Sequence, residues 1–232
     1  YTLRHCSRAL PRHLRYDGGM MRRLGGFSAL TCLQQAAMNF GILLIQRLVD
    51  SFGPVVMAAF AAAVKIDTLA YLPVQDFGNA FSTFAAQNYG AGQQARLRDG
   101  MRTATAMSAG FSLAASVLVV ALARPLLQIF IPASQTEVLA CGVQYLRIEG
   151  AFYVGIGCLF LLYGFYRAID RPAMSLVLTV ISLGTRVALA YLLAGPVGPA
   201  GIWLAIPIGW FLADVFGYGV YFRLRRGREK AV

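Results

Sequence analysis

The segment Tyr71–Gly92, "YLPVQDFGNAFSTFAAQNYGAG", decides how the fold of this chain is interpreted. It contains one aspartate, two asparagines and two glutamines, and it lies among long apolar runs. Each run is about 20 residues or longer, which is enough to cross ~30 Å of hydrocarbon. An aspartate at mid-bilayer costs about 2.5–3.5 kcal/mol on insertion scales, so these polar side chains must face protein or water.

The composition of the whole chain indicates an integral membrane protein. Of its 232 residues 58% are hydrophobic and only 13% are charged, and the mean hydropathy is +0.60. A soluble domain carries roughly 25% charged residues. Six apolar segments predict six transmembrane helices, at residues 27–48, 55–87, 103–123, 141–166, 173–194 and 200–222. The second exceeds one perpendicular span, so we expect its first third to tilt or to lie outside the hydrocarbon.

The fold class that follows is an all-α membrane protein of six transmembrane helices. We expect a basic cytoplasmic linker at residues 1–25, a six-helix lobe at 26–222 and a basic tail at 223–232. The chain begins with tyrosine, and no apolar signal sequence precedes the first span. We therefore expect a fragment whose missing part lies upstream.

The net charge of +11 is a topology signal. Sixteen of the 21 Lys and Arg residues fall in four segments that share one side if six helices alternate: the N-terminal segment, "GAGQQARLRDGMR", "RAIDRP" and the tail. The opposite loops hold only Arg124. This asymmetry places both ends in the cytoplasm and argues against a nucleic-acid partner.

The sequence offers little to catalysis or metal binding. Its only histidines, His5 and His13, precede the first span, and its four cysteines show no metal-binding spacing. No span combines a nucleophile with a base, so a membrane-embedded enzyme is the weakest of the functional readings.

Two neighbouring spans carry narrow polar rows at helical spacing. One row contains Asp76, Asn79, Thr83 and Gln87, and the other contains Thr31, Gln35, Asn39 and Gln46. One interpretation is hydrogen bonding between helices, at about 0.6 kcal/mol per bond. The other is a wet cavity for a substrate or coupling ion, which is the default hypothesis for an ionisable group such as Asp76 at membrane depth.

The later spans carry further charged residues. Glu149 has Tyr145 and Tyr153 one turn away, and we group Glu149 and Tyr153 with the cavity residues. Arg186 is interpreted as a structural or coupling charge, and a buried Glu149–Arg186 pair would compensate both groups. Asp67 projects opposite Asp76, and we expect it to pair with Lys65 or Arg47.

Several segments together resemble the multidrug and toxic compound extrusion (MATE) family. "NAFSTFAAQNYGAGQ" resembles the signature after that family's eighth helix, and "YLRIEGAFYVGIGCLFLLYGFYRAIDRP" resembles its tenth helix and following turn. "TRVALAYLLAGPVGPAGIWLAIPIGW" resembles its eleventh and twelfth helices. The resemblance runs over essentially the whole chain and is nearest to the bacterial putative multidrug efflux branch.

The resemblance implies the C-terminal lobe of a twelve-helix antiporter in the bacterial cytoplasmic (inner) membrane. The implied partners are the missing N-terminal lobe, the lipid bilayer and cationic small-molecule substrates. Protons or sodium ions would be the coupling ion, with no other cofactor and no metal. Sodium-type members carry a glutamate in the seventh helix, where this chain has Gln34 and Gln35. A lipid-linked oligosaccharide flippase of the same superfamily and a non-transport membrane scaffold remain alternatives.

Overall fold

The computed structural model describes residues 18–229, apart from the side chains of residues 23, 225 and 227–229. All regular secondary structure in that range is helical, which confirms the predicted all-α class. The helices are α2 (Gly18–Asp50), α3 (Pro54–Gly90), α4 (Gln94–Ala121), α5 (Ala123–Gln128), α6 (Thr136–Gly150), α7 (Tyr153–Ala168), α8 (Pro172–Val197) and α9 (Pro199–Glu229). Residues 1–17 of the predicted linker lie outside the described residues, whereas residues 18–25 already belong to α2. The predicted division into linker, lobe and tail stays a prediction.

Five of these helices, α2, α3, α4, α8 and α9, are each long and apolar enough to span a bilayer. The remaining predicted span, the fourth at 141–166, is broken: α6 and α7 meet at a bend of 52°. At the break the N–H of Phe152 donates to the Glu149 carbonyl at 3.0 Å, and the N–H of Gly155 donates to the Phe152 carbonyl at 2.9 Å. The predicted span at 141–166 is thus formed by two helices, with Gly150 and Gly155, which are weak helix formers, on either side of the break.

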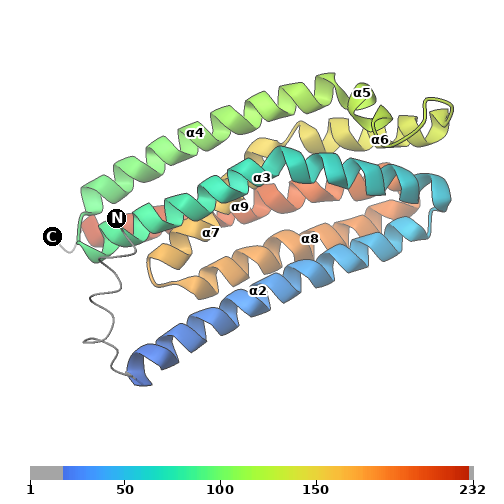
Figure 1. The fold of residues 1–232 in the computed structure, drawn as a ribbon. Coiled ribbons are helices and arrows are strands. Elements are labelled where there is room, and N and C mark those ends of the chain that lie inside the picture. The colour runs from blue at the N-terminus through green and yellow to red at the C-terminus, as the bar shows by residue number, and fades with distance from the viewer. Residues whose placement is uncertain (1–17, 230–232) are drawn as a thin grey trace, which may run out of the picture.

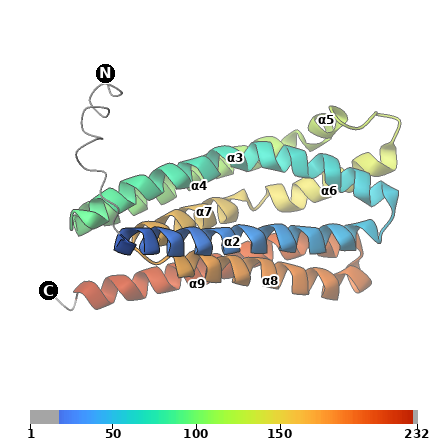
Figure 2. The same cartoon turned by 60° about the horizontal axis from the view of Figure 1, so that its bottom comes forward.

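The helices form an elongated bundle in which sequence neighbours do not always pack together (Figure 1). The longest helix, α3, packs along α7, α6 and α4, and α9 packs along α8. The first described helix, α2, lies mainly against α8 and touches α3 much less, as the turned view also shows (Figure 2). One long side of α2 and one of α3 are therefore left without a neighbour in this bundle.

Glycines set the closest helix crossings. A Cβ added at Gly164 of α7 would lie 2.4 Å from the carbonyl oxygen of Gly78 on α3. A Cβ added at Gly209 of α9 would lie 2.4 Å from the carbonyl oxygen of Ser182 on α8. Both crossings bring backbone against backbone, as small residues allow in membrane helices.

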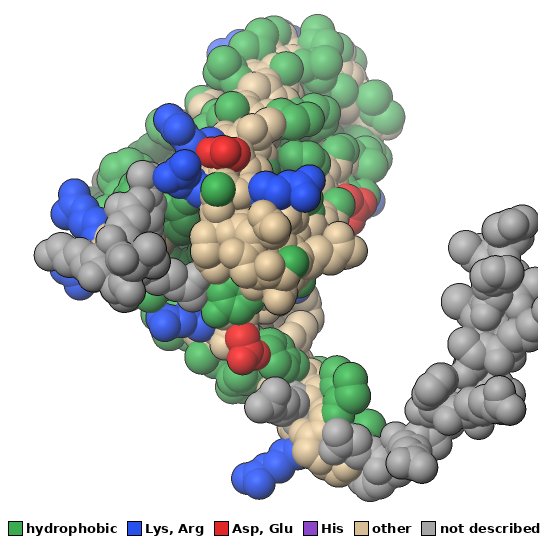
Figure 3. All heavy atoms as spheres, turned by 90° about the vertical axis from the view of Figure 1, so that its left-hand side faces the viewer, with side chains coloured by type: hydrophobic (Ala, Val, Ile, Leu, Met, Phe, Trp, Pro, Cys, Tyr) green, Lys and Arg blue, Asp and Glu red, His purple; other side chains and the backbone are tan. Residues whose placement is uncertain are grey.

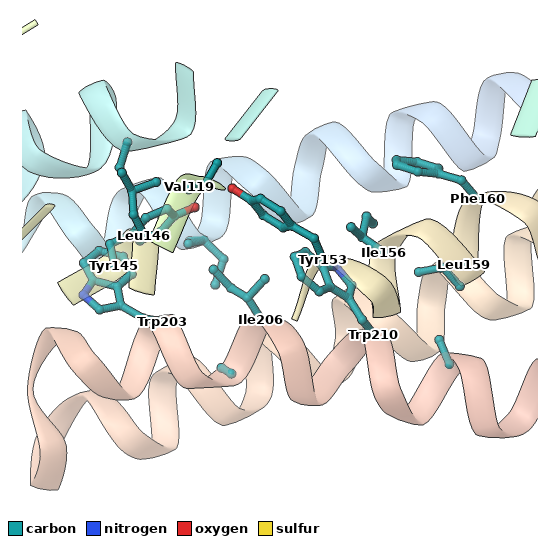
Figure 4. Close-up of a cluster of buried hydrophobic side chains, with 14 of the residues drawn as sticks. Val119, Tyr145, Leu146, Tyr153, Ile156, Leu159, Phe160, Trp203, Ile206 and Trp210 are labelled. Carbon is teal, nitrogen blue, oxygen red and sulfur yellow. The ribbon is translucent and has the colours of Figure 1, made fainter. Parts of the chain in front are cut away.

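An aromatic group fills the core between α3, α6 and α9. Trp203 is fully buried. The Phe60 ring stacks on it at 5.6 Å and the Tyr145 ring meets it edge-on at 4.8 Å. Figure 4 shows Tyr145 and Trp203 side by side at one end of this packed layer, with Ile206 and Trp210 continuing along α9. The core thereby fixes the position of α6 just before its break.

Basic side chains gather at the end of the bundle where α3 and α9 finish and α4 and α8 begin (Figures 1 and 3). The expected basic loop before the third span is shorter than predicted, because α4 already begins at Gln94. Its residues Arg98 and Asp99 form an exposed ion pair at 3.6 Å. The described basic segments therefore share one end, as the alternation of six helices requires.

Candidate functional site

The two predicted polar rows lie on the outside of this bundle. Every member is exposed: Asp76, Asn79, Thr83 and Gln87 on α3, and Thr31, Gln35, Asn39 and Gln46 on α2. The opposite face of α3 is buried, with Val74, Gly78, Phe81 and Ala85 turned into the core. The rows therefore contribute little to packing within this lobe.

A hydrogen bond links the α3 row to α7. The Nη2 of Arg167, at the end of α7, donates to the Oδ1 of Asn79 at 3.1 Å, and its Nε donates to the Tyr163 carbonyl at 3.2 Å. The Arg167 guanidinium thus borders the α3 row at Asn79, which lies three residues after Asp76 in the helix.

The paired glutamines of α2 have different environments. Gln34 is buried, and its Nε2 donates to the Oγ1 of Thr179 on α8 at 3.1 Å. Thr179 in turn donates to the Ser175 carbonyl at 2.9 Å. Gln35 is exposed in the polar row. Gln34 therefore attaches α2 to α8, and only Gln35 faces outward.

Replacing Gln34 with methionine is expected to lower stability by no more than about 1 kcal/mol. Methionine keeps the length of the side chain, and a single hydrogen bond between membrane helices averages about 0.6 kcal/mol. The measurement is the midpoint of thermal unfolding in detergent, with Gln35→Met as the exposed control. A large loss of stability would mean that the Gln34–Thr179 bond belongs to a wider network.

A second polar group lies inside the lobe, and we call it the acid cluster: Asp67 of α3, Tyr145 and Glu149 of α6, and Tyr153 of α7. Asp67 and Glu149 are only 2% and 4% exposed. The Tyr153 hydroxyl donates to the Oδ1 of Asp67, and it points away from α9 (Figure 4). Glu149 and Tyr145 flank the same carboxylate closely enough to interact with it.

The acid cluster is not neutralised by an ion pair. Among the described side chains the one ion pair within 4.0 Å is Arg98–Asp99, so the predicted Glu149–Arg186 pair does not form. Arg186 acts on both carboxylates only from a greater distance. The second oxygens of Asp67 and Glu149, and the Nε of Arg186, are buried without a hydrogen-bond partner.

The expected partners of Asp67 lie elsewhere. The Lys65 ammonium sits over the Phe130 ring, 5.5 Å from its centroid, and both Lys65 and Arg47 are exposed. Asp67 was not among the predicted site residues. Its projection on the helix face opposite Asp76 was the signal that could have indicated burial, because the face opposite an outward polar row is turned toward the core.

The helix break places the acid cluster at a discontinuity. Glu149 lies in the last turn of α6 and Tyr153 begins α7. Discontinuous membrane helices bring free backbone groups to the ion and substrate sites of many transporters. Within residues 18–229 no three His, Cys, Asp or Glu side chains form a metal-binding group. Two carboxylates, two phenol hydroxyls and the break can hold one proton or one small monovalent cation.

Comparisons with known proteins agree on the class of this chain. The MatE family profile matches residues 31–192. The "Probable multidrug resistance protein YpnP" of Bacillus subtilis (strain 168) is 30% identical over 201 residues. A crystal structure of MATE in complex with MaL6 superposes with a TM-score of 0.87 at 19% identity. A mutant of the Vibrio cholerae MATE transporter VcmN superposes with a TM-score of 0.82 at 21% identity.

The coverage of these matches is unequal. The match to the Bacillus protein covers 86% of this chain but 44% of that protein. The match to the MaL6 complex covers 96% of this chain and 50% of that chain. The match to the Vibrio protein covers 88% of this chain and 46% of that chain. The chain thus spans about half the length of the relatives it matches.

Proposed function

Since this chain belongs to the MatE family, whose members are transporters, we propose that it is one lobe of a secondary antiporter that exports cationic amphipathic compounds. Protons or sodium ions moving inward would drive export by alternating access. The observation that carries this proposal is the separation of two polar groups: exposed rows on α2 and α3, and a buried, unneutralised acid cluster behind α3.

The rows are assigned to the substrate path. Polar side chains on membrane-spanning helices are stable only against protein or water. Because the chain spans about half of its relatives, a second lobe facing α2 and α3 would enclose these rows in a polar passage. Asp76 is the acid of the rows, so it is the proposed partner of a positively charged substrate, with Gln35, Asn39, Asn79 and Gln87 as neutral contacts.

The acid cluster is assigned to the coupling ion. Two acids face one distant guanidinium, and an uncompensated buried charge is unfavourable. Uptake of one proton or sodium ion would relieve that state. The cluster belongs to three helices, α3, α6 and α7, and α3 carries the substrate row on its other face. Ion binding at Asp67 and substrate binding at Asp76 would therefore act on the same helix, on either side of Pro73.

The orientation follows from the charges. The end of the bundle that carries the basic residues (Figure 3) is assigned to the cytoplasm by the positive-inside rule, in the cytoplasmic membrane of a bacterium. A flippase for lipid-linked oligosaccharides fits less well, because a pyrophosphate needs cations along its path. The proposed substrate rows contain one aspartate and no Lys or Arg of their own, so the Arg167 guanidinium beside Asn79 is the cation they would offer to a pyrophosphate.

Replacing Asp76 with asparagine is expected to slow efflux of a cationic dye at least about fivefold, because the carboxylate that attracts the dye is lost. The assay uses the natural full-length protein in cells or proteoliposomes, at matched protein levels. Asp99→Asn, which alters an exposed acid at the basic end, is the control. Undiminished efflux by Asp76→Asn would remove this residue from the substrate path.

A further inference from the structure

A cavity between α7 and α9 is used by none of the assignments above. Its volume is about 440 Å³, within the roughly 300–1,000 Å³ of typical ligand pockets. Its wall is formed by the α6–α7 break, one face of α7 and one face of α9, and includes Phe152, Gly155, Cys158, Phe211, Asp214 and Val215. Among the described side chains, Asp214 is the one charged group that lines it.

The Asp214 carboxylate has no visible partner in this wall. Its Oδ1 is buried without a hydrogen bond, and its Oδ2 lies 3.8 Å from the Cβ position of Gly155 on α7. Among the described side chains no Lys or Arg forms an ion pair with it. The Asp214 side chain is directed toward α7 and not toward the aqueous end of α9. A carboxylate in apolar surroundings is stabilised only when a counter-charge or a proton accompanies it.

The cavity mouth lies on an apolar surface. Phe152, Phe211 and Val215 are 54%, 66% and 55% exposed, and all three line the cavity. The lining comes from the break, α7 and α9, whereas the polar rows belong to α2 and α3. In a membrane-spanning bundle an apolar exposed surface of this kind faces lipid, so the cavity opens toward the bilayer rather than toward the rows.

We propose that this cavity is a lipid-accessible binding site for one hydrophobic organic cation, such as a quaternary ammonium or protonated amine. Asp214 supplies the opposite charge, and the apolar wall accommodates the body of the ligand. Phe152 and Phe211 at the mouth offer aromatic faces that attract cations. The site stands apart from the Asp76 row, and the proposal holds whether or not Asp76 contacts a transported substrate.

The position of the cavity also gives an occupant access to the helix break. Phe152 lies in the break, between Glu149 and Tyr153 of the acid cluster. Tyr153 turns into the cluster, whereas Gly155 and Cys158 of the same helix face the cavity. A bound cation therefore contacts the opposite side of the first turns of α7 from the acid cluster.

A matched pair of photo-reactive probes tests the proposal. One is a benzophenone with a trimethylammonium end group, and the other carries the neutral isostere, a tert-butyl group. Each is cross-linked to the full-length natural protein in phospholipid nanodiscs without an ion gradient, and labelled peptides are identified by mass spectrometry. The cationic probe is expected to label residues 151–158 and 211–218 at least about tenfold more than the neutral probe, the ratio that follows from about 1.4 kcal/mol of charge preference.

Three variants locate the preference. Asp214→Asn is expected to abolish the stronger labelling by the cationic probe, and Asp76→Asn is expected to leave the ratio of cationic to neutral labelling unchanged. Val215→Trp, on the exposed rim, should reduce labelling by the cationic probe without changing the carboxylate. Equal labelling by the two probes would overturn the proposal and identify the cavity as filled by lipid or by any apolar molecule. A preference that survives both Asp214→Asn and Val215→Trp would place the cation elsewhere and overturn it equally.

Discussion

Replacing Gly164 with valine is expected to destabilise the bundle by about 3 kcal/mol or to prevent its accumulation. Even the first added carbon would lie 2.4 Å from the Gly78 carbonyl oxygen, and a backbone atom cannot move aside as a flexible side chain can. Overpacking a tight interface costs about 1–3 kcal/mol, and the two further methyl carbons of valine put this case at the upper end. The affected crossing joins α3 to α7, the two helices that share the Tyr153–Asp67 hydrogen bond.

Gly184→Val is the matched control for this prediction. Gly184 lies within α8, is exposed and has no atom within 4 Å of an added Cβ. The same change of residue therefore meets open space. The measurement is the temperature at which the full-length protein in detergent loses its monodisperse chromatographic peak. Equal midpoints for the two variants would show that α3 and α7 do not meet as closely as the Gly78–Gly164 contact requires.

Replacing Glu149 with glutamine is expected to reduce gradient-driven efflux at least about tenfold while thermal stability is kept or rises. Glutamine retains the shape of the side chain but cannot exchange a proton and binds a monovalent cation weakly. It also removes one of two like charges that lie close together in a buried site, which relieves repulsion. A purely structural role predicts the opposite combination, in which stability is lost along with transport.

The experiment compares Glu149→Gln with Glu137→Gln in proteoliposomes under imposed proton or sodium gradients. Glu137 lies on the same helix, in its exposed first turn, so it controls for a general loss of acidity. If sodium is the coupling ion, wild-type protein should also unfold at a higher temperature in sodium chloride than in potassium chloride, because a ligand of the folded state stabilises it. Glu149→Gln should lose that difference. Full efflux by Glu149→Gln would exclude the acid cluster from coupling.

The sequence by itself determined the class and the outward polar rows of this protein. Hydrophobic runs of membrane-spanning length are a local property, so the six spans could be read directly. The helical spacing of Asp76, Asn79, Thr83 and Gln87 is also local, and the structure leaves this row exposed. The resemblance to MATE transporters rested on motifs contiguous in the chain, and the MatE match over residues 31–192 confirms it.

Only the tertiary structure decided which buried charges meet. Asp67 and Glu149 are 82 residues apart in the chain, and nothing in either segment specifies that α3 and α6 place them together beside Tyr153. The break between α6 and α7 likewise depends on packing, because the same glycines permit a straight helix or a bend. Partners of a buried charge are set by which faces of distant helices come into contact, and that depends on the packing of the whole bundle.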